Sequence, residues 1–144
     1  MFADFLRRLT APAPLPEPDA RLALAALLVR IARADNHYAA EEVIQIDRIL
    51  ATRYGLDTAG AAGLRGEAER LEAEAPDTVR FTRAIKDAVP YDHRVGVIEA
   101  MWSVVLADGG RADEENALMR LAASLLGVSD PDSARARQQA AINR

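Results

Sequence analysis

The sequence predicts an all-α fold, a multihelical bundle with two central buried helices. Half of the 144 residues are hydrophobic, and they are mostly Ala and Leu rather than alternating Val, Ile and aromatic residues. This composition favours helices over strands by intrinsic propensity. The chain is also long enough to bury one substantial core. We therefore expect one helical domain over residues 19–144, preceded by an amphipathic arm and a Pro-rich connector over residues 1–18.

The arm is predicted from a short stripe of apolar residues at helical spacing. The stripe consists of Phe2, Phe5, Leu6 and Leu9. Four prolines between residues 12 and 18 favour a polyproline II connector. Arg7 and Arg8 interrupt the apolar run, which is also far too short to cross a bilayer, so we expect neither a signal peptide nor a transmembrane segment. The stripe is expected to pack on the bundle, or to bind a partner protein or a membrane surface.

Pro18 and Asp19 mark the start of the first predicted central helix, which continues with few polar positions to Asp35. The next helix is predicted over residues 40–54, because Gly55 is a typical residue just beyond a helix end. The residues of this helix expected to point inward are Val43, Ile46, Ile49 and Leu50, with Ile44 on its flank.

The third helix is predicted to start at Asp57 or Thr58 and to end near Glu74. It is the least apolar helix, so we expect it on the surface. A short helix ending at Pro90 follows. Residues 91–107 then form the second central helix, since apolar side chains cover nearly its whole circumference, as is typical of a buried helix.

Two further helices are predicted after the second central helix. One runs from Asp113 to Leu126 and ends at Gly127. The last is polar and is expected to be capped by Asp130, with Pro131 at its first position, where the missing amide proton costs no hydrogen bond.

An acidic pattern occurs twice in the chain. Asp35 and Glu42 in the first copy correspond to Asp108 and Glu115 in the second, and each copy lies between an apolar helical run and an amphipathic one. The simplest interpretation is an internal helix-loop-helix duplication. A carboxylate at a helix C-terminus is normally unfavourable by roughly 0.3–1 kcal/mol, because the macrodipole is already negative there. Here Asp35 and Asp108 both take that position.

The string Ala-Asp-Asn/Gly, then four intervening residues, then Glu-Glu resembles the TerB-like family, first associated with tellurite resistance. The resemblance extends from about residue 20 to residue 136 and includes both acidic motifs. It implies an all-helical bundle with a divalent-cation-binding or stress-linked role, often in bacteria, and no defined catalytic activity. Asn36 stands where the first motif usually carries Gly, and Ala39 and Ala112 stand where Ser or Thr usually opens the next helix.

The chemistry of the two acidic turns fits a divalent cation. Asp35, Glu42, Asp108 and Glu115 are the predicted metal ligands. Carboxylates and the free carbonyls of a helix C-terminus are the oxygen ligands that Ca²⁺, Mg²⁺ and Mn²⁺ accept. His37 could add a nitrogen ligand and favour Zn²⁺ or Mn²⁺, but the second copy has Gly110 in its place, so we expect a solvated loop residue there.

A purely structural role explains the same acids. Glu42 and Glu115 stand where a glutamate accepts a hydrogen bond from the amide at the helix start. Asp35 and Asp108 are suited to Asx turns that close the preceding helices. The alternative function is therefore a metal-independent helical module that binds another protein through the arm or a groove of the bundle.

Several function classes are disfavoured by composition. The absence of cysteine excludes disulfides and thiolate metal sites and fits a cytoplasmic protein. A net charge of −4 gives no electrostatic signature of nucleic-acid binding. Neither a nucleophile motif nor a Gly-rich phosphate loop is present, and no Glu-x-x-His pair suggests a dimetal enzyme. We therefore expect no catalytic residues and no enzymatic activity.

Overall fold

The computed structural model describes residues 17–74, 78–107 and 113–142. Helices account for most of these residues, which contain no strand, and this confirms the predicted all-α fold. The helices are α2 (Glu17–Arg33), α3 (Ala40–Tyr54), α4 (Thr58–Glu74), α5 (Val79–Ala88), α6 (Tyr91–Ala107), α7 (Asp113–Leu125) and α8 (Asp130–Ile142). The helix α2 begins slightly before the predicted start of the domain at residue 19, and the predicted arm lies outside the described residues.

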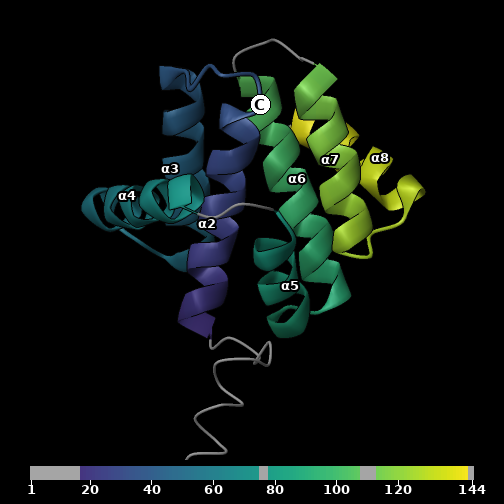
Figure 1. Ribbon diagram of the computed structural model, residues 1–144, viewed down its shortest axis with the longest axis horizontal. Helices are drawn as coiled ribbons and strands as arrows, with labels where there is room; N and C mark the ends of the chain where they lie inside the picture. The colour runs from purple at the N-terminus through teal and green to yellow at the C-terminus, as the bar shows by residue number, and fades with distance from the viewer. Residues whose placement is uncertain (1–16, 75–77, 108–112, 143–144) are drawn as a thin grey trace, which may run out of the picture.

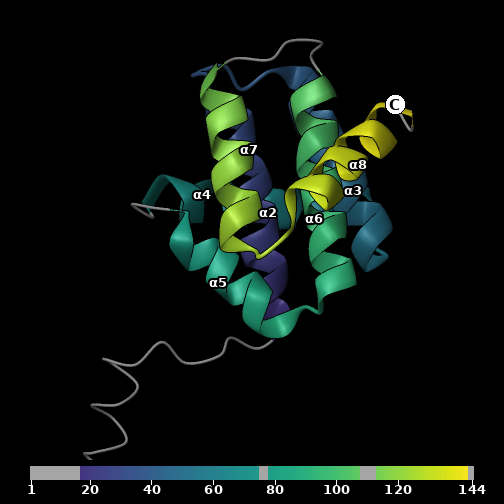
Figure 2. The same ribbon diagram turned by 90° about the vertical axis from the view of Figure 1, so that its right-hand side faces the viewer.

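The helices α2 and α6 form the centre of the bundle, as the sequence predicts. The helix α2 packs against α3, α4, α5, α6 and α7, and α6 packs against α2, α3, α5, α7 and α8. In Figures 1 and 2 both run along the middle of the bundle, with the other helices arranged around them. Leu27, Leu28 and Ile31 of α2 and Ile98 and Met101 of α6 are completely buried. The core therefore lies mainly between these two helices and their neighbours.

The helix ends are set by local backbone chemistry. Gly55 follows α3 with a φ of 63°, and Gly127 follows α7 with a φ of 71°; glycine adopts this left-handed conformation at little cost. Asp57 starts α4, since its Oδ1 accepts the amide proton of Gly60 at 2.7 Å. The cap of α8 differs from the prediction: the hydroxyl of Ser129, rather than Asp130, accepts the amide proton of Asp132 at 3.3 Å.

The helix α4 runs across α2 and α3 on the outside of the bundle (Figure 1). Its fully buried residues are the small Ala61 and Ala68, and Leu64 and Leu71 are partly buried against the core. This agrees with its predicted surface position and places its charged side chains beside α2 and α3.

The helix boundaries on either side of the two acidic turns correspond closely. The helix α3 starts at Ala40 and α7 starts at Asp113, which are equivalent positions in the two copies. The helix α2 ends at Arg33 and α6 ends at Ala107, one position later in the repeat. The internal duplication itself stays a prediction.

Candidate functional site

The first acidic turn connects α2 to α3 and is closed by Asp35. Its Oδ1 accepts the amide proton of His37 at 2.9 Å, and its backbone carbonyl lies 3.2 Å from Nδ1 of the same histidine. Between these residues, Asn36 has a φ of 65° and donates its amide proton to the carbonyl of Arg33 at 3.0 Å. Asp35 therefore forms the predicted Asx turn, and His37 is exposed, as expected of a solvated loop residue.

Glu42 lies in the first turn of α3 and is completely buried. Its Oε1 accepts the amide proton of Ala39 at 2.9 Å, which is the glutamate half of a capping box. In a complete capping box, a side-chain oxygen of the residue at position 39 would accept the amide proton of Glu42. Ala39 has no such oxygen. The neighbouring Glu41 is exposed, and the two adjacent glutamates therefore occupy opposite environments.

The second acidic turn repeats this burial pattern. Glu115, in the first turn of α7, is 1% exposed, while the preceding Glu114 is exposed. Asp108, the remaining predicted ligand, lies outside the described residues. The N-termini of α3 and α7 lie at the same end of the bundle, at the top of Figures 1 and 2. The fold thus places both buried glutamates in the helical turns at this end.

The described part of the predicted metal site does not form a complete coordination sphere. Within residues 17–74, 78–107 and 113–142, no three His, Asp or Glu side chains are grouped closely enough to hold a cation. Asp35, Glu42 and Glu115 supply carboxylate oxygens suited to a hard cation. The described structure therefore does not bring Asp35, Glu42 and Glu115 together as one three-carboxylate group, and Asp108 lies outside the described residues.

A second candidate site is an open groove of about 690 Å³ between α3 and α6, reached at one end by α8. One wall is the outer face of α3, where Ile44 is 58% exposed beside the polar side chains of Gln45 and Arg48. The floor is formed by small residues of α6, and Ala140 of α8 lies at one end. The small residues of α6 are Gly96, Ala100, Ser103 and Ala107. The groove can therefore accept an elongated, partly apolar ligand.

Comparison with known proteins gives one family. The family model for tellurite resistance protein TerB matches residues 21–138, which is most of the chain. The chain belongs to the TerB family. The match extends from α2 into α8 and includes both acidic turns of this TerB-family chain. No curated protein and no solved structure shows significant similarity to it.

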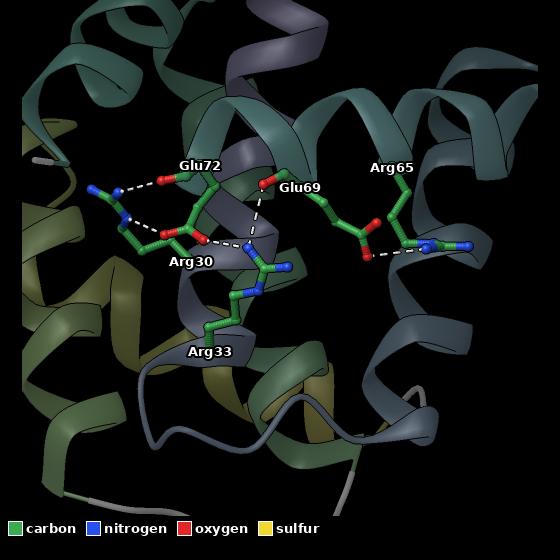
Figure 3. A network of polar contacts seen from close by, with 5 residues as sticks. All are labelled: Arg30, Arg33, Arg65, Glu69 and Glu72. Atoms are coloured by element: carbon green, nitrogen blue, oxygen red, sulfur yellow. Dashed lines mark hydrogen bonds and ion pairs between the residues drawn. The ribbon is translucent and has the colours of Figure 1, made fainter. Parts of the chain in front are cut away.

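Beside the first acidic turn, this TerB-family chain has a charged network that the sequence analysis did not predict (Figure 3). Glu72 of α4 binds two arginines of α2: its Oε2 lies 3.1 Å from Nε of Arg30, and its Oε1 lies 2.7 Å from Nη1 of Arg33. The same arginines also donate to backbone carbonyls of α4, Arg30 to Glu72 and Arg33 to Glu69. These contacts join the last turns of α2 to the last turns of α4.

The network continues from α4 to α3 through Arg65. Its Nε lies 2.6 Å from Oδ1 of Asp47, and its Nη1 lies 3.1 Å from Oε2 of Glu69. Tyr38 lies in the loop before α3, and the guanidinium carbon of Arg33 is 5.0 Å from the centre of its ring. Burial and the nearby Glu69 carboxylate raise the pKa of the Tyr38 hydroxyl above its ordinary value, so it stays protonated. Only the spacing of Arg30 and Arg33 on one edge of α2 could have indicated this network.

No helix in the described parts of the chain is long and apolar enough to cross a bilayer.

Proposed function

We propose that this TerB-family chain is a non-enzymatic, cytoplasmic bacterial protein that binds a divalent cation at the end of the bundle where α3 and α7 begin. The observation that supports the proposal most directly is the matched burial of Glu42 and Glu115 at equivalent helix positions. A helix start is stabilised by an exposed acid as well as by a buried one. Capping alone therefore does not require both glutamates to be withdrawn from water.

The cost of burying a carboxylate supports the same proposal. An ionised carboxylate removed from water is strongly unfavourable unless hydrogen bonds, a cationic side chain or a metal ion stabilise it. Glu42 accepts the amide proton of Ala39 through Oε1. Asp35 likewise accepts one amide proton through Oδ1. We propose Asp35, Glu42 and Glu115, together with Asp108, as the ligands of Ca²⁺, Mg²⁺, Mn²⁺ or Zn²⁺.

Thermal melting with each of the four cations tests this function. A cation at about 100 times its dissociation constant should raise the free energy of unfolding by roughly 2.7 kcal/mol, because it binds only the native state, and a chelator should reverse the effect. A melting temperature that none of the four cations changes would contradict the proposal.

The two pairs of adjacent glutamates provide a matched control for this experiment. The double variant Glu42→Gln, Glu115→Gln should abolish the response to cation, because an amide is a much weaker ligand than a carboxylate. The double variant Glu41→Gln, Glu114→Gln removes the same charge from exposed neighbours and should keep the response. Equal responses in the two double variants would show that the buried carboxylates are not ligands.

A metal-independent interaction module is the second candidate function, and the groove between α3 and α6 favours it. In that case Glu42 acts only as a cap, so Glu42→Ala should cost about 0.5–2 kcal/mol whether or not cation is present. A melting temperature that no cation changes, together with this lower free energy of unfolding in Glu42→Ala, would support the interaction module.

We propose resistance to tellurite or another metal stress as the physiological role, on the basis of family membership alone. The test is growth of a tellurite-sensitive bacterial strain that expresses the wild-type chain or the Glu42→Gln, Glu115→Gln variant. Protection by the wild type and not by the variant would support both the role and its dependence on cation binding.

A further inference from the structure

The groove between α3 and α6 continues toward the start of α2. A second hollow, of about 730 Å³, adjoins it and shares Arg53 and Gly96 with it. The second hollow is also lined by Ala20 and Arg21 of the first turns of α2. The polypeptide that precedes α2 therefore joins the bundle at one end of this continuous depression.

We propose that the N-terminal arm of this chain, residues 2–9, docks as an amphipathic helix in the groove between α3 and α6. The proposal goes beyond cation binding and does not depend on it. The arm lies outside the described residues, and its helical pattern comes from the sequence. The apolar stripe of the arm would face the groove, so that Ile44 of α3 and the small residues of α6 become covered.

The lengths of the connector and the groove permit this docking. Residues 10–16 as a polyproline II segment would span about 22 Å, and the second hollow adjoins both the start of α2 and the groove. Eight residues of helix extend about 12 Å, and the floor of the groove from Gly96 to Ala107 extends about 16 Å along α6. The arm therefore fits within the groove without any rearrangement of the bundle.

The shape of the groove matches the chemistry of the arm. Because the residues of α6 that line the groove are small, the groove has room for the side chains of Phe2 and Phe5. An ideal Cβ on Gly96 would meet only Nη1 of Arg53, at 3.6 Å, so the floor at this position is open to a side chain from outside. Docking would remove the exposed apolar surface of Ile44 from water.

The arm and the groove both carry charged side chains. On a helix whose apolar stripe faces the groove, Arg7 and Arg8 are about 100° apart and both lie on the side away from the stripe. The two rims of the groove carry one acid each, Glu41 on α3 and Glu99 on α6, and neither forms an ion pair with another described residue. Two arginines, Arg48 and Arg53, also line the groove; they donate to the neutral Gln45 side chain and to the His93 carbonyl, so both keep their positive charge.

The absence of cysteine allows a direct test with a single nitroxide label on Ala3→Cys, a position beside the apolar stripe. If the arm docks, the label should reduce the amide signals of Ile44, Gly96 and Ser103, while the amide of Leu121, which is exposed on α7, keeps its intensity. A uniform loss of amide signal intensity over the surface, or a loss centred on α7, would overturn the proposal.

Two variants identify the contact and control for folding. Phe2→Ser with Phe5→Ser removes the stripe, and Ala100→Phe fills the groove, so each should restore the intensities at Ile44 and Gly96. The dispersion of the same spectra shows whether each variant is folded. Persistent loss at the groove in a folded Phe2→Ser, Phe5→Ser variant would overturn the proposal.

The remaining occupants give distinct results. To detect an arm that docks on a second copy, nitroxide-labelled chains are mixed with isotope-enriched chains that carry no nitroxide. If the amide signals of the isotope-enriched chains fall as much as they do within the nitroxide-labelled chain itself, the arm docks on a second copy rather than on its own bundle. Sedimentation with vesicles of anionic phospholipid, in the absence of signal loss at the groove, would assign the arm to a lipid surface instead.

Discussion

The backbone of Asn36 determines the shape of the first acidic turn. Its φ of 65° lies in the left-handed region. Among the residues that the structure describes, Asn36 is the only non-glycine residue with a positive φ. Asparagine tolerates this region better than most residues because its short polar side chain can hydrogen-bond locally. The turn at Asn36 brings the amide of His37 to Asp35. The left-handed backbone therefore explains why an asparagine suits this position.

Substitutions of Asn36 should depend on backbone conformation rather than on contacts. Asn36→Gly should change the free energy of unfolding by less than about 0.5 kcal/mol, whereas Asn36→Val should lower it by about 1–2 kcal/mol, because a β-branched residue is strained at this φ. Urea denaturation measures both changes. His37→Val is the matched control, since His37 is exposed and has no positive φ. Equal losses for Asn36→Val and His37→Val would refute this explanation.

The individual site residues were predictable to different degrees. The sequence repeat identified Asp35, Glu42 and Glu115 because a two-copy pattern stands out without any structure. It did not predict that Glu41 is exposed while Glu42 is completely buried, since adjacent residues are distinguished only by how α3 is rotated against its neighbours. Nor did it predict the pairing of Arg30 with Glu72, which lie 42 positions apart. Contacts between distant segments depend on the packing of whole helices.

At the scale of elements, α4 is attached to the bundle differently from the other helices. Its fully buried residues are alanines, with Leu64 and Leu71 partly buried. Ion pairs join its Glu72 to Arg30 and Arg33 and its Arg65 to Asp47. The Glu72 side chain is 13% exposed, so its two ion pairs are partly shielded from salt. The position of α4 should therefore depend more on charge than the position of α2 or α6 does.

Glu72→Ala should lower the free energy of unfolding by about 1–3 kcal/mol, because two arginines lose a shared, partly buried carboxylate. Hydrogen exchange should show the largest increase in α4, with α6 little changed. Glu74→Ala is the control, as Glu74 is exposed on the same helix. If the two variants are equally stable, the network does not hold α4 in place.

The helices themselves were largely predictable because their ends are marked in the sequence. Gly55 and Gly127 end α3 and α7 through their left-handed backbone, and Pro90 immediately precedes α6. The start of α8 was assigned wrongly because Ser129 and Asp130 are both good capping residues, and only the geometry shows which side chain accepts the amide proton. How α4 lies across α2 and α3 had no signal in the sequence, because its apolar stripe is weak.

At the scale of the whole molecule, the described helices form one core centred on α2 and α6. All of the core residues identified in the structure belong to the domain that follows the arm. Independence of this core from the arm and its connector stays a prediction.

Deletion of residues 1–16 should leave a chain that unfolds cooperatively with its helical circular dichroism signal preserved, since α2 begins at Glu17. The cation response, if present in the full chain, should also be retained, because the acidic turns lie in the remaining domain. Loss of cooperative unfolding in the truncated chain would show that the apolar stripe is part of the core.

Trp102 is the single tryptophan of the chain, and its position determines what its fluorescence can report. It is 9% exposed on α6, and the guanidinium of Arg137 on α8 lies 5.3 Å from its ring. Its emission therefore senses the interface between α6 and α8 and gives no direct view of α4 or of the first acidic turn. An optical titration at these other places needs a probe introduced there, and a tryptophan in place of Tyr38 would supply one beside Arg33.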